Sequence, residues 1–218
     1  QGKAVSLISA GIDSPVAAWL MMRRGVRMVF LHVEPGRYGG PDTGRNLEKN
    51  LVALSRWIPG LELPFISIPA EPFYQALMDL HEPKLRCVIC KHAMLKLALQ
   101  YAKKTGCDGI VTGDNLGQVA TQTLYNLASI SSGIDIPVYR PLIGYDKEEI
   151  ITLARKIGTY SSDPGDTSCA ALPTRPVTRS DAGEIEEIME SSSMKEIIQE
   201  IQKSSVKKII KNGIITDA

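Results

Sequence analysis

The segment from Lys3 to Gly25 constrains the fold of this chain most strongly, because it predicts a strand, a tight loop and a helix in succession. Residues 4–8 (Ala-Val-Ser-Leu-Ile) are mostly apolar and predict a strand that is buried on both faces. The loop that follows, residues 9–14, reads Ser-Ala-Gly-Ile-Asp-Ser. Pro15 is tolerated in a first helical turn, and Gly25 is typical of a helix end. The free backbone N–H groups and the helix dipole at such a loop favour a bound anion.

The sequence of this loop excludes two common nucleotide-binding loops and resembles a third. It lacks the Gly-x-x-x-x-Gly-Lys-Ser/Thr of Walker loops and the Gly-x-Gly-x-x-Gly of dinucleotide binders. It resembles the Ser-Gly-Gly-x-Asp-Ser signature of the PP-loop ATP pyrophosphatases, whose loop holds the β- and γ-phosphates of ATP. Ala10 replaces a glycine of that signature, and a positive φ there would cost roughly 1 kcal/mol, so we expect an ordinary backbone angle. The alternative is a Ser- and Gly-rich turn without a ligand.

Composition bounds the class of protein. The 218 residues suffice for one substantial core, and 25 Lys+Arg against 24 Asp+Glu give a net charge of +1. This charge argues against a chain that binds nucleic acid through its overall charge. No apolar run approaches the ~20 residues of a membrane span and no signal peptide precedes the first strand, so we expect a cytoplasmic protein. Four cysteines, two of them in a Cys-x-x-C, suit a reducing compartment and metal or redox chemistry.

Apolar runs alternate with amphipathic segments along most of the chain. Strands are predicted at residues 4–8, 27–33, 63–68, 108–113 and 136–140, and helices at 15–25, 46–58, 71–80, 87–104, 117–130 and 146–157. Asp146 is the predicted N-cap of the last of these helices. This alternation predicts an α/β fold with a doubly wound, parallel, five-stranded sheet. Ligands bind outside the carboxyl ends of such strands, so we expect the ends of the first, second and fourth strands to surround the site.

The pattern changes after Gly158. Residues 159–179 are rich in Ser, Thr, Asp and Pro, and an irregular loop of about 20 residues in a compact domain indicates either a functional loop or a wrong assignment. Residues 180–190 and 194–203 predict helices, and the basic tail over residues 206–218 contains a Lys-Asn-Gly-Ile turn that is compatible with a small hairpin. We therefore divide the chain into a nucleotide-binding domain over residues 1–178 and a helical C-terminal extension of the same domain over residues 179–218.

A second motif, Thr-Gly-Asp-Asn-Leu-Gly-Gln-Val-Ala-Thr-Gln-Thr over residues 112–123, begins at the end of the fourth predicted strand. Gly113 would allow a nucleotide to approach the backbone closely, and Gln118 and Gln122 lie four apart on one predicted helical face. The alternative is an ordinary strand-to-helix turn with polar caps.

Cys87 and Cys90 form a third motif, a Cys-x-x-C between two cations at the start of the long predicted helix. The helix dipole and the flanking cations predict lowered thiol pKa values. Two thiolates can share a metal, form a disulfide or simply pack, and a closed tetrahedral zinc site lacks further partners here. The best additional ligand is Cys169 in the irregular loop. We interpret Cys107 as a packing residue and assign no histidine a metal-ligand role.

Together with Arg-Pro-Leu-Ile-Gly-Tyr-Asp-Lys-Glu-Glu-Ile at residues 140–150, these motifs resemble the catalytic domain of tRNA 4-thiouridine synthetase. This family is also called the thiamine-biosynthesis sulfurtransferase ThiI, and the resemblance extends over residues 3–179. The family usually carries N-terminal ferredoxin-like and THUMP domains that grip tRNA, and some members add a C-terminal rhodanese domain. The motifs of this chain cover only the catalytic domain, and the chain opens without Met, so we expect those domains to be absent from this fragment.

The resemblance implies an ATP-dependent reaction in two steps. ATP adenylates the C4 oxygen of a tRNA uridine with release of pyrophosphate, and sulfur then displaces AMP to give 4-thiouridine. Sulfur transfer for the thiazole of thiamine is a second implied activity. By resemblance, Asp13 acts through Mg²⁺ on the phosphates. Lys147 faces the phosphates or the adenylated oxygen, unless it is a solvated lysine. The implied nucleotide site consists of Leu7, Ile8, Ser9, Gly11, Ser14, His32, Val33, Lys91, Gly113 and Gln122.

The resemblance also implies how sulfur is handled. Cys169 matches the cysteine that carries a persulfide in bacterial members, whereas archaeal-type members combine it with the Cys-x-x-C to hold an iron–sulfur cluster. Because this chain has Cys87, Cys90 and Cys169, the resemblance favours the cluster over a disulfide. The sulfur donor, a persulfide carrier or sulfide, and the oligomeric state, a monomer or a homodimer, stay open. The alternatives for the function are another PP-loop tRNA thiolase, an amidating enzyme, and a non-catalytic nucleotide-binding module of the universal-stress type.

Overall fold

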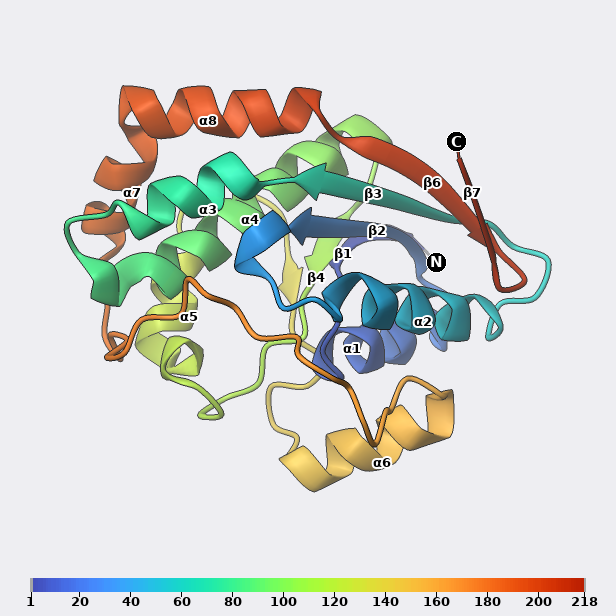
Figure 1. The fold of residues 1–218 in the computed structure, drawn as a ribbon. Coiled ribbons are helices and arrows are strands. Elements are labelled where there is room, and N and C mark those ends of the chain that lie inside the picture. The colour runs from blue at the N-terminus through green and yellow to red at the C-terminus, as the bar shows by residue number, and fades with distance from the viewer. Residues whose placement is uncertain (1, 218) are drawn as a thin grey trace.

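The computed structural model describes residues 2–217 and is built on one seven-stranded sheet with the order β5-β4-β1-β2-β3-β6-β7 (Figure 1). The first five strands pair in parallel, and β1 lies between β2 and β4. The α/β class and all five predicted strands are confirmed. These strands are β1 (Lys3–Leu7), β2 (Arg27–Glu34), β3 (Leu63–Pro69), β4 (Gly109–Val111) and β5 (Val138–Tyr139).

Helices cover both faces of the sheet, because successive side chains of each strand point to opposite sides. Ala4 and Phe30 contribute to the apolar core on one face, and Val5 and Leu31 to the core on the other. The first face is covered by α1 (Asp13–Met22), α2 (Thr43–Ser55) and α6 (Lys147–Ile157). The second face is covered by α3 (Glu71–Met78), α4 (Arg86–Thr105), α5 (Leu124–Ile130), α7 (Ala182–Glu190) and α8 (Ser192–Lys203). Three short 3₁₀ helices lie at Gly36–Tyr38, Pro83–Leu85 and Ala120–Gln122.

The C-terminal extension differs from the prediction, because it adds two strands to the sheet. Its helices α7 and α8 are present, but β6 (Val206–Lys211) and β7 (Ile214–Asp217) form a hairpin that pairs antiparallel with β3. The turn consists of Asn212 and Gly213, which have φ values of 51° and 83°, as a two-residue hairpin turn requires. The sheet therefore has seven strands and not the five that the sequence predicted.

The predicted helix over residues 117–130 is also wrong in its first half. Gly117 has a φ of +76° and Val119 is extended, so helical backbone cannot run through them. A 3₁₀ turn over residues 120–122 follows, and α5 begins only at Leu124. Thr123 caps this helix, because its side chain accepts a hydrogen bond from the Asn126 N–H. Gln118 and Gln122 consequently do not share the face of one helix.

The irregular segment 159–179 crosses the carboxyl ends of the parallel strands, as Figure 1 shows in orange. It pairs with the loop after β2 through three backbone hydrogen bonds: Gly40 N–H to Ser168 O, Asp42 N–H to Asp166 O and Ala170 N–H to Tyr38 O. This arrangement carries Cys169 to the end of the sheet where ligands bind. Within residues 2–217, no helix combines the length and the apolar character that crossing a membrane requires.

Candidate active site

The carboxyl ends of β1, β2 and β4 open into a cavity of about 440 Å³. All ten predicted nucleotide-binding residues line this cavity, together with Asp13 and Cys169. A wider cavity of about 590 Å³ lies beside it, between α2 and β6, and shares His32, Pro35, Gly39 and Thr43 with it. Arg37 and Lys208 line the wider cavity, whereas Lys91 and the loop 9–14 line only the smaller one.

The loop 9–14 is closed by its own serines. The Ser9 N–H donates to Ser14 Oγ at 2.9 Å, and the two hydroxyl oxygens lie 3.0 Å apart. Ala10 has an ordinary backbone angle as predicted, because Asn212 is the only non-glycine residue with a positive φ among residues 2–217. No side chain caps the N-terminus of α1 at Ile12, so the N–H groups of the first turn are available to an anion.

Gly113 allows a close contact within the protein. A Cβ at this position would lie 2.6 Å from the Ser14 nitrogen and 2.8 Å from the Ser14 Cα. The sequence predicted close approach of a nucleotide here, whereas the neighbouring atoms in the structure belong to the start of α1. Gly113 therefore packs the end of β4 directly against the loop that begins α1.

Lys91 lies on the cavity wall and donates to Asp114 Oδ1 at 2.7 Å. Asp114 also accepts from Thr112 Oγ1 at 2.9 Å and lies 3.6 Å from Arg140 Nε. Burial alone would raise the pKa of the Asp114 carboxyl, but the charge and hydrogen bond of Lys91, the Thr112 hydroxyl and the Arg140 charge hold that pKa below its ordinary value. The two cations and one carboxylate leave a net positive charge beside the cavity. The sequence interpretation missed Asp114, although it directly follows Gly113 in the second motif.

Asp13 and Lys147 meet at the mouth of the cavity, although they are far apart in the sequence. Lys147 Nζ lies 3.1 Å from Asp13 Oδ1, and 49% of the Lys147 side chain is exposed. Lys147 belongs to the first turn of α6 and does not itself line the cavity. Its contact with Asp13 brings it to the start of α1.

His32 is buried and forms a hydrogen bond with the backbone of Ile8, the residue that follows β1. Its Nδ1 lies 2.9 Å from the Ile8 carbonyl oxygen, so Nδ1 carries the proton and donates. Burial lowers the pKa of His32, and the imidazole is therefore neutral at pH 7.

The thiols of the Cys-x-x-C differ from the prediction. Burial raises the pKa of Cys90 to about 12, and burial together with the charge of Cys169 raises the pKa of Cys87. Lys91 lowers both pKa values as predicted, but the loss of hydration outweighs it. The Cys90 sulfur instead lies 3.8 Å from the Tyr74 hydroxyl.

All four cysteines are free thiols, and only Cys169 lines the cavity. In the described part of the chain, no three His, Cys, Asp or Glu side chains are grouped as ligands of one metal ion. The predicted set of Cys87, Cys90 and Cys169 is therefore not gathered around a single ion. Cys107 packs against the core, as predicted, with its sulfur 3.2 Å from Thr105 Oγ1.

The sequence interpretation also missed polar residues of α2 that contact the site. Asn50 donates to the carbonyl oxygens of Ser9 and Gly11 at 3.2 Å each, and Asn46 donates to Pro164 O. Both amides are buried in an otherwise amphipathic helix. Two asparagines spaced four residues apart next to the apolar stripe were the available signal.

The chain is similar in sequence to a known family of proteins. The family model "Thiamine biosynthesis protein (ThiI)" matches residues 1–194. A probable tRNA sulfurtransferase of Methanobrevibacter smithii is 40% identical over 200 residues, which cover 91% of this chain and 52% of that protein. The chain thus spans about half the length of the curated relatives it matches.

Solved structures show the same fold. The crystal structure of a 4-thiouridine synthetase–RNA complex with bound ATP superposes with a TM-score of 0.90 at 33% identity and covers 96% of this chain and 55% of that one. NMN synthetase from Francisella tularensis has a TM-score of 0.58 at 15% identity, covers 93% of this chain and 84% of that one, and supports the fold alone. The chain belongs to the thiamine biosynthesis protein (ThiI) family.

Proposed function

We propose that this chain is the ATP-dependent catalytic part of a tRNA sulfurtransferase that makes 4-thiouridine. The observation that carries the proposal is the single cavity that combines the uncapped start of α1, Lys91 and the exposed thiol of Cys169. A phosphate-binding loop and a thiol in one cavity suit a reaction in which ATP activates an oxygen and sulfur replaces it. The names of the relatives and of the superposed RNA complex support the same reaction.

ATP would bind with its adenine against the ends of β1 and β2, where Leu7, Ile8, His32 and Val33 lie. Its β- and γ-phosphates would occupy the loop of Ser9, Gly11 and Ser14, with Lys91, Gly113 and Gln122 completing the site. A cavity of about 440 Å³ lies within the usual range of roughly 300–1,000 Å³ for small-molecule sites. Main-chain N–H and C=O groups at the strand ends can form hydrogen bonds with the edge of the adenine base.

In the first step, the uridine C4 oxygen attacks the α-phosphorus, and the bond to the bridging oxygen of pyrophosphate breaks. The N–H groups at the start of α1 would stabilise the charge on the departing pyrophosphate. Asp13 provides a carboxylate at the cavity mouth that fits a Mg²⁺ ion on the phosphates, and this ion would neutralise their charge. Lys147, which contacts Asp13, adds a cation at the same point. In the second step, sulfur attacks C4 and AMP leaves with the oxygen.

We propose that Cys169 handles the sulfur and that Cys87 and Cys90 complete an iron–sulfur cluster with it. Three soft sulfur donors suit iron, so Cys87, Cys90 and Cys169 are the residues that would hold the cluster. Cys169 lines the cavity together with Tyr74, and the Cys90 sulfur lies 3.8 Å from the Tyr74 hydroxyl. When bound, the cluster would offer an open iron to which sulfide can bind.

Anaerobic purification tests this arrangement. We expect a brown protein whose iron content and visible absorption are lost after Cys→Ser substitution at position 87, 90 or 169. Cys107→Ser serves as the matched control and should keep the colour. A colourless protein with a persulfide on Cys169 would contradict the cluster and leave Cys169 as a persulfide carrier.

Asp13→Ala tests the proposed function itself. We expect pyrophosphate release in the presence of ATP and tRNA to fall at least 100-fold, with the circular-dichroism spectrum unchanged. Mass spectrometry of the tRNA nucleosides identifies the thiolated base and separates 4-thiouridine formation from the other thiolases. Pyrophosphate release by the mutant at the parent rate would refute the assignment of the loop.

We also propose residues 1–178 as the nucleotide-binding domain and residues 179–218 as its extension. The pairing of β6 with β3 supports a single domain. The proposed partners are tRNA and a sulfur donor, either a persulfide carrier or sulfide, and the proposed assembly is a homodimer.

A further inference from the structure

Helix α2 and the residue before it place three polar residues near the site at intervals of four. Asp42 precedes the helix, and Asn46 and Asn50 follow on the same face. Asn46 is 4% exposed and Asn50 is 3% exposed, so their amides need partners within the protein. The partners lie in two different loops.

Asn50 contacts the loop 9–14 on the side of its carbonyl groups. Its Nδ2 lies 3.2 Å from the carbonyl oxygens of both Ser9 and Gly11. In a loop that offers its N–H groups to an anion, the carbonyl oxygens must face away, because their negative ends repel phosphate. The Asn50 amide satisfies two of these carbonyl groups and thereby fixes the direction of the loop.

Asp42 and Asn46 bind the loop that carries Cys169. Asp42 stands at the N-cap position of α2 but does not cap this helix. Its carboxylate instead accepts from the Asp166 N–H at 2.9 Å, and its own N–H donates to Asp166 O at 3.0 Å. Asn46 donates to Pro164 O. The other oxygen of Asp42 pairs with Arg45 in the first turn of α2 at 2.8 Å, so Asp42 connects its own helix to the neighbouring loop.

Two glycines make this close approach possible. A Cβ at Gly165, whose φ is +63°, would lie 2.5 Å from Asp42 Cγ. A Cβ at Gly40 would lie 2.6 Å from the Asp166 carbonyl carbon. The backbone bond from Gly40 to Ser168 O, at 2.8 Å, continues the contact up to Cys169 itself.

We infer that α2 is a rigid spacer that sets the position of the Cys169 thiol relative to the phosphate loop. Asn50 is a positioning residue for the adenylation step, and Asp42 and Asn46 are positioning residues for sulfur transfer. Asp42 and Asn50 are eight positions apart, which corresponds to about 12 Å along a helix at 1.5 Å per residue. Because sulfur must reach the carbon whose oxygen was activated on the nucleotide, this separation has to be fixed. The inference rests on the proposed function.

The two ends of α2 can be tested separately in the full chain. For Asp42→Ala, we expect pyrophosphate release within threefold of the parent, and at least tenfold less 4-thiouridine per pyrophosphate released. Asp42→Asn keeps an acceptor oxygen for the Asp166 N–H and should restore the yield. For Asn50→Ala, we expect the KM for ATP to rise at least tenfold. Lys49→Ala, an exposed change on the same helix, is the matched control and should alter neither step.

A second readout does not require thiolation. Iodoacetamide labelling of Cys169, quantified on its peptide, should be at least threefold faster in Asp42→Ala and in Gly165→Ala than in the parent. ATP affinity in both variants should be unchanged. If the parent makes no pyrophosphate, the proposed function fails while this readout still decides the inference. Two results would overturn the role of α2. One is an equal loss of pyrophosphate release and of 4-thiouridine formation in Asp42→Ala. The other is unchanged labelling of Cys169 in both Asp42→Ala and Gly165→Ala.

Discussion

His92 lies completely buried on α4, where its Nδ1 donates to the Ile130 carbonyl oxygen at 3.0 Å. Its Nε2 has no hydrogen-bond partner and lies 3.6 Å from Glu186, which Lys96 contacts at 3.1 Å. Burial lowers the pKa of His92, and the charge of Lys96 acts in the same direction. The hydrogen bond to Ile130 and the charge of Glu186 oppose them without prevailing. The imidazole is therefore neutral in the folded protein at pH 7.

This burial predicts a loss of stability in mild acid. Below the ordinary histidine pKa of 6.5, the unfolded chain binds more protons than the folded one. The free energy of unfolding should therefore fall as the pH drops from 6.5 through the lower pKa of the folded state. His92→Asn keeps a donor for the Ile130 carbonyl but does not titrate, so its urea midpoint should fall less between pH 7.5 and pH 5. Equal losses in parent and variant would contradict the prediction. His32 acts in the same direction, so part of the loss should remain.

Gly113 is the residue at which one methyl group should disturb the nucleotide site most directly. Gly113→Ala places a Cβ 2.6 Å from the Ser14 nitrogen, so the start of α1 must shift. We expect at least tenfold weaker ATP binding by calorimetry and a loss of about 1–3 kcal/mol in stability, as for other overpacked sites. Gly144→Ala is the control, because no atom lies within 4 Å of its added Cβ. Parent-like ATP binding in Gly113→Ala would show that the contact can relax.

Among the elements, the β6–β7 hairpin is held by its pairing with β3 and also by contacts of its turn. The Asn212 side chain accepts from the Gly60 N–H at 2.9 Å, and the Gly213 N–H donates to Ser55 Oγ at 2.8 Å. These bonds connect the turn to the segment between α2 and β3. The turn thereby fixes the hairpin in register beside β3.

Substitution of Asn212 should separate the two contributions of this residue. Asn212→Ala loses the hydrogen bond and leaves alanine at a φ of 51°, so we expect a loss of about 2 kcal/mol in the free energy of unfolding. Asn212→Gly loses only the hydrogen bond and should cost about 1 kcal/mol. Urea denaturation measures both values. A larger loss in the glycine variant would contradict the role of the backbone angle.

Elements with strong local signals could be predicted from the sequence, and those that depend on distant partners could not. The capping box of α6 followed from Asp146 and is completed by Glu149. The hairpin strand β6 depends on β3, far away in the sequence, and no local pattern encodes that pairing. The raised thiol pKa of Cys90 likewise depends on burial in the folded core, beside Tyr74. The ten nucleotide-site residues could be named because they belong to motifs that resemble those of the family. Asp42, Asn46 and Asn50 lie outside these motifs.

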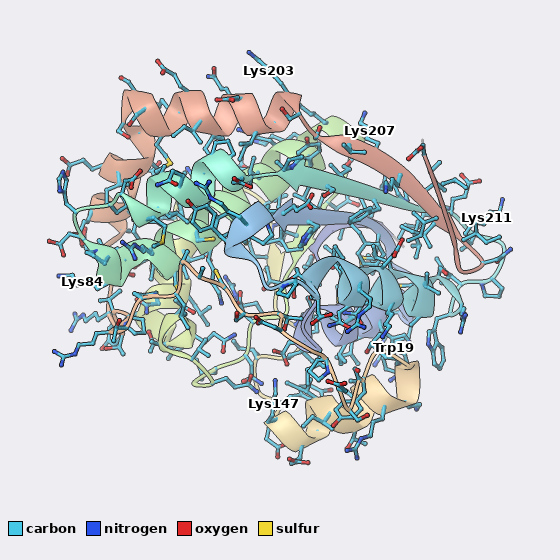
Figure 2. All side chains as sticks on the ribbon, in the orientation of Figure 1. Trp19, Lys84, Lys147, Lys203, Lys207 and Lys211 are labelled. Atoms are coloured by element: carbon cyan, nitrogen blue, oxygen red, sulfur yellow. The ribbon has the colours of Figure 1, made fainter. Side chains whose placement is uncertain are left out.

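Over the whole molecule, positive charge is spread out. Lys203, Lys207 and Lys211 follow the edge formed by α8 and β6, whereas Lys84 and Lys147 lie on other sides (Figure 2). Several lysines are also paired, as Lys211 is with Glu62 at 3.2 Å. A net charge of +1 and this dispersion leave few cations for a continuous contact with a phosphate backbone.

We therefore predict weak tRNA binding by the 218-residue chain alone. Between 50 and 200 mM salt, the affinity measured by filter binding should change less than about tenfold, because only a few counterions are released. A poly-lysine-tagged version should show a steeper dependence and serves as the comparison. Tight binding that falls by about a thousandfold over the same range would contradict this prediction.

The late position of β6 in the chain has a consequence during synthesis. β3 and β2 are close in the chain and can pair early, but the other edge of β3 pairs with a strand more than a hundred residues downstream. At about 5–20 residues per second, this delay is on the order of ten seconds. Through that interval the N–H and C=O groups along one edge of β3 are open to pairing with a strand of another nascent chain. Chains that emerge close together on one messenger RNA are therefore most exposed to mispairing just before translation of β6 is complete.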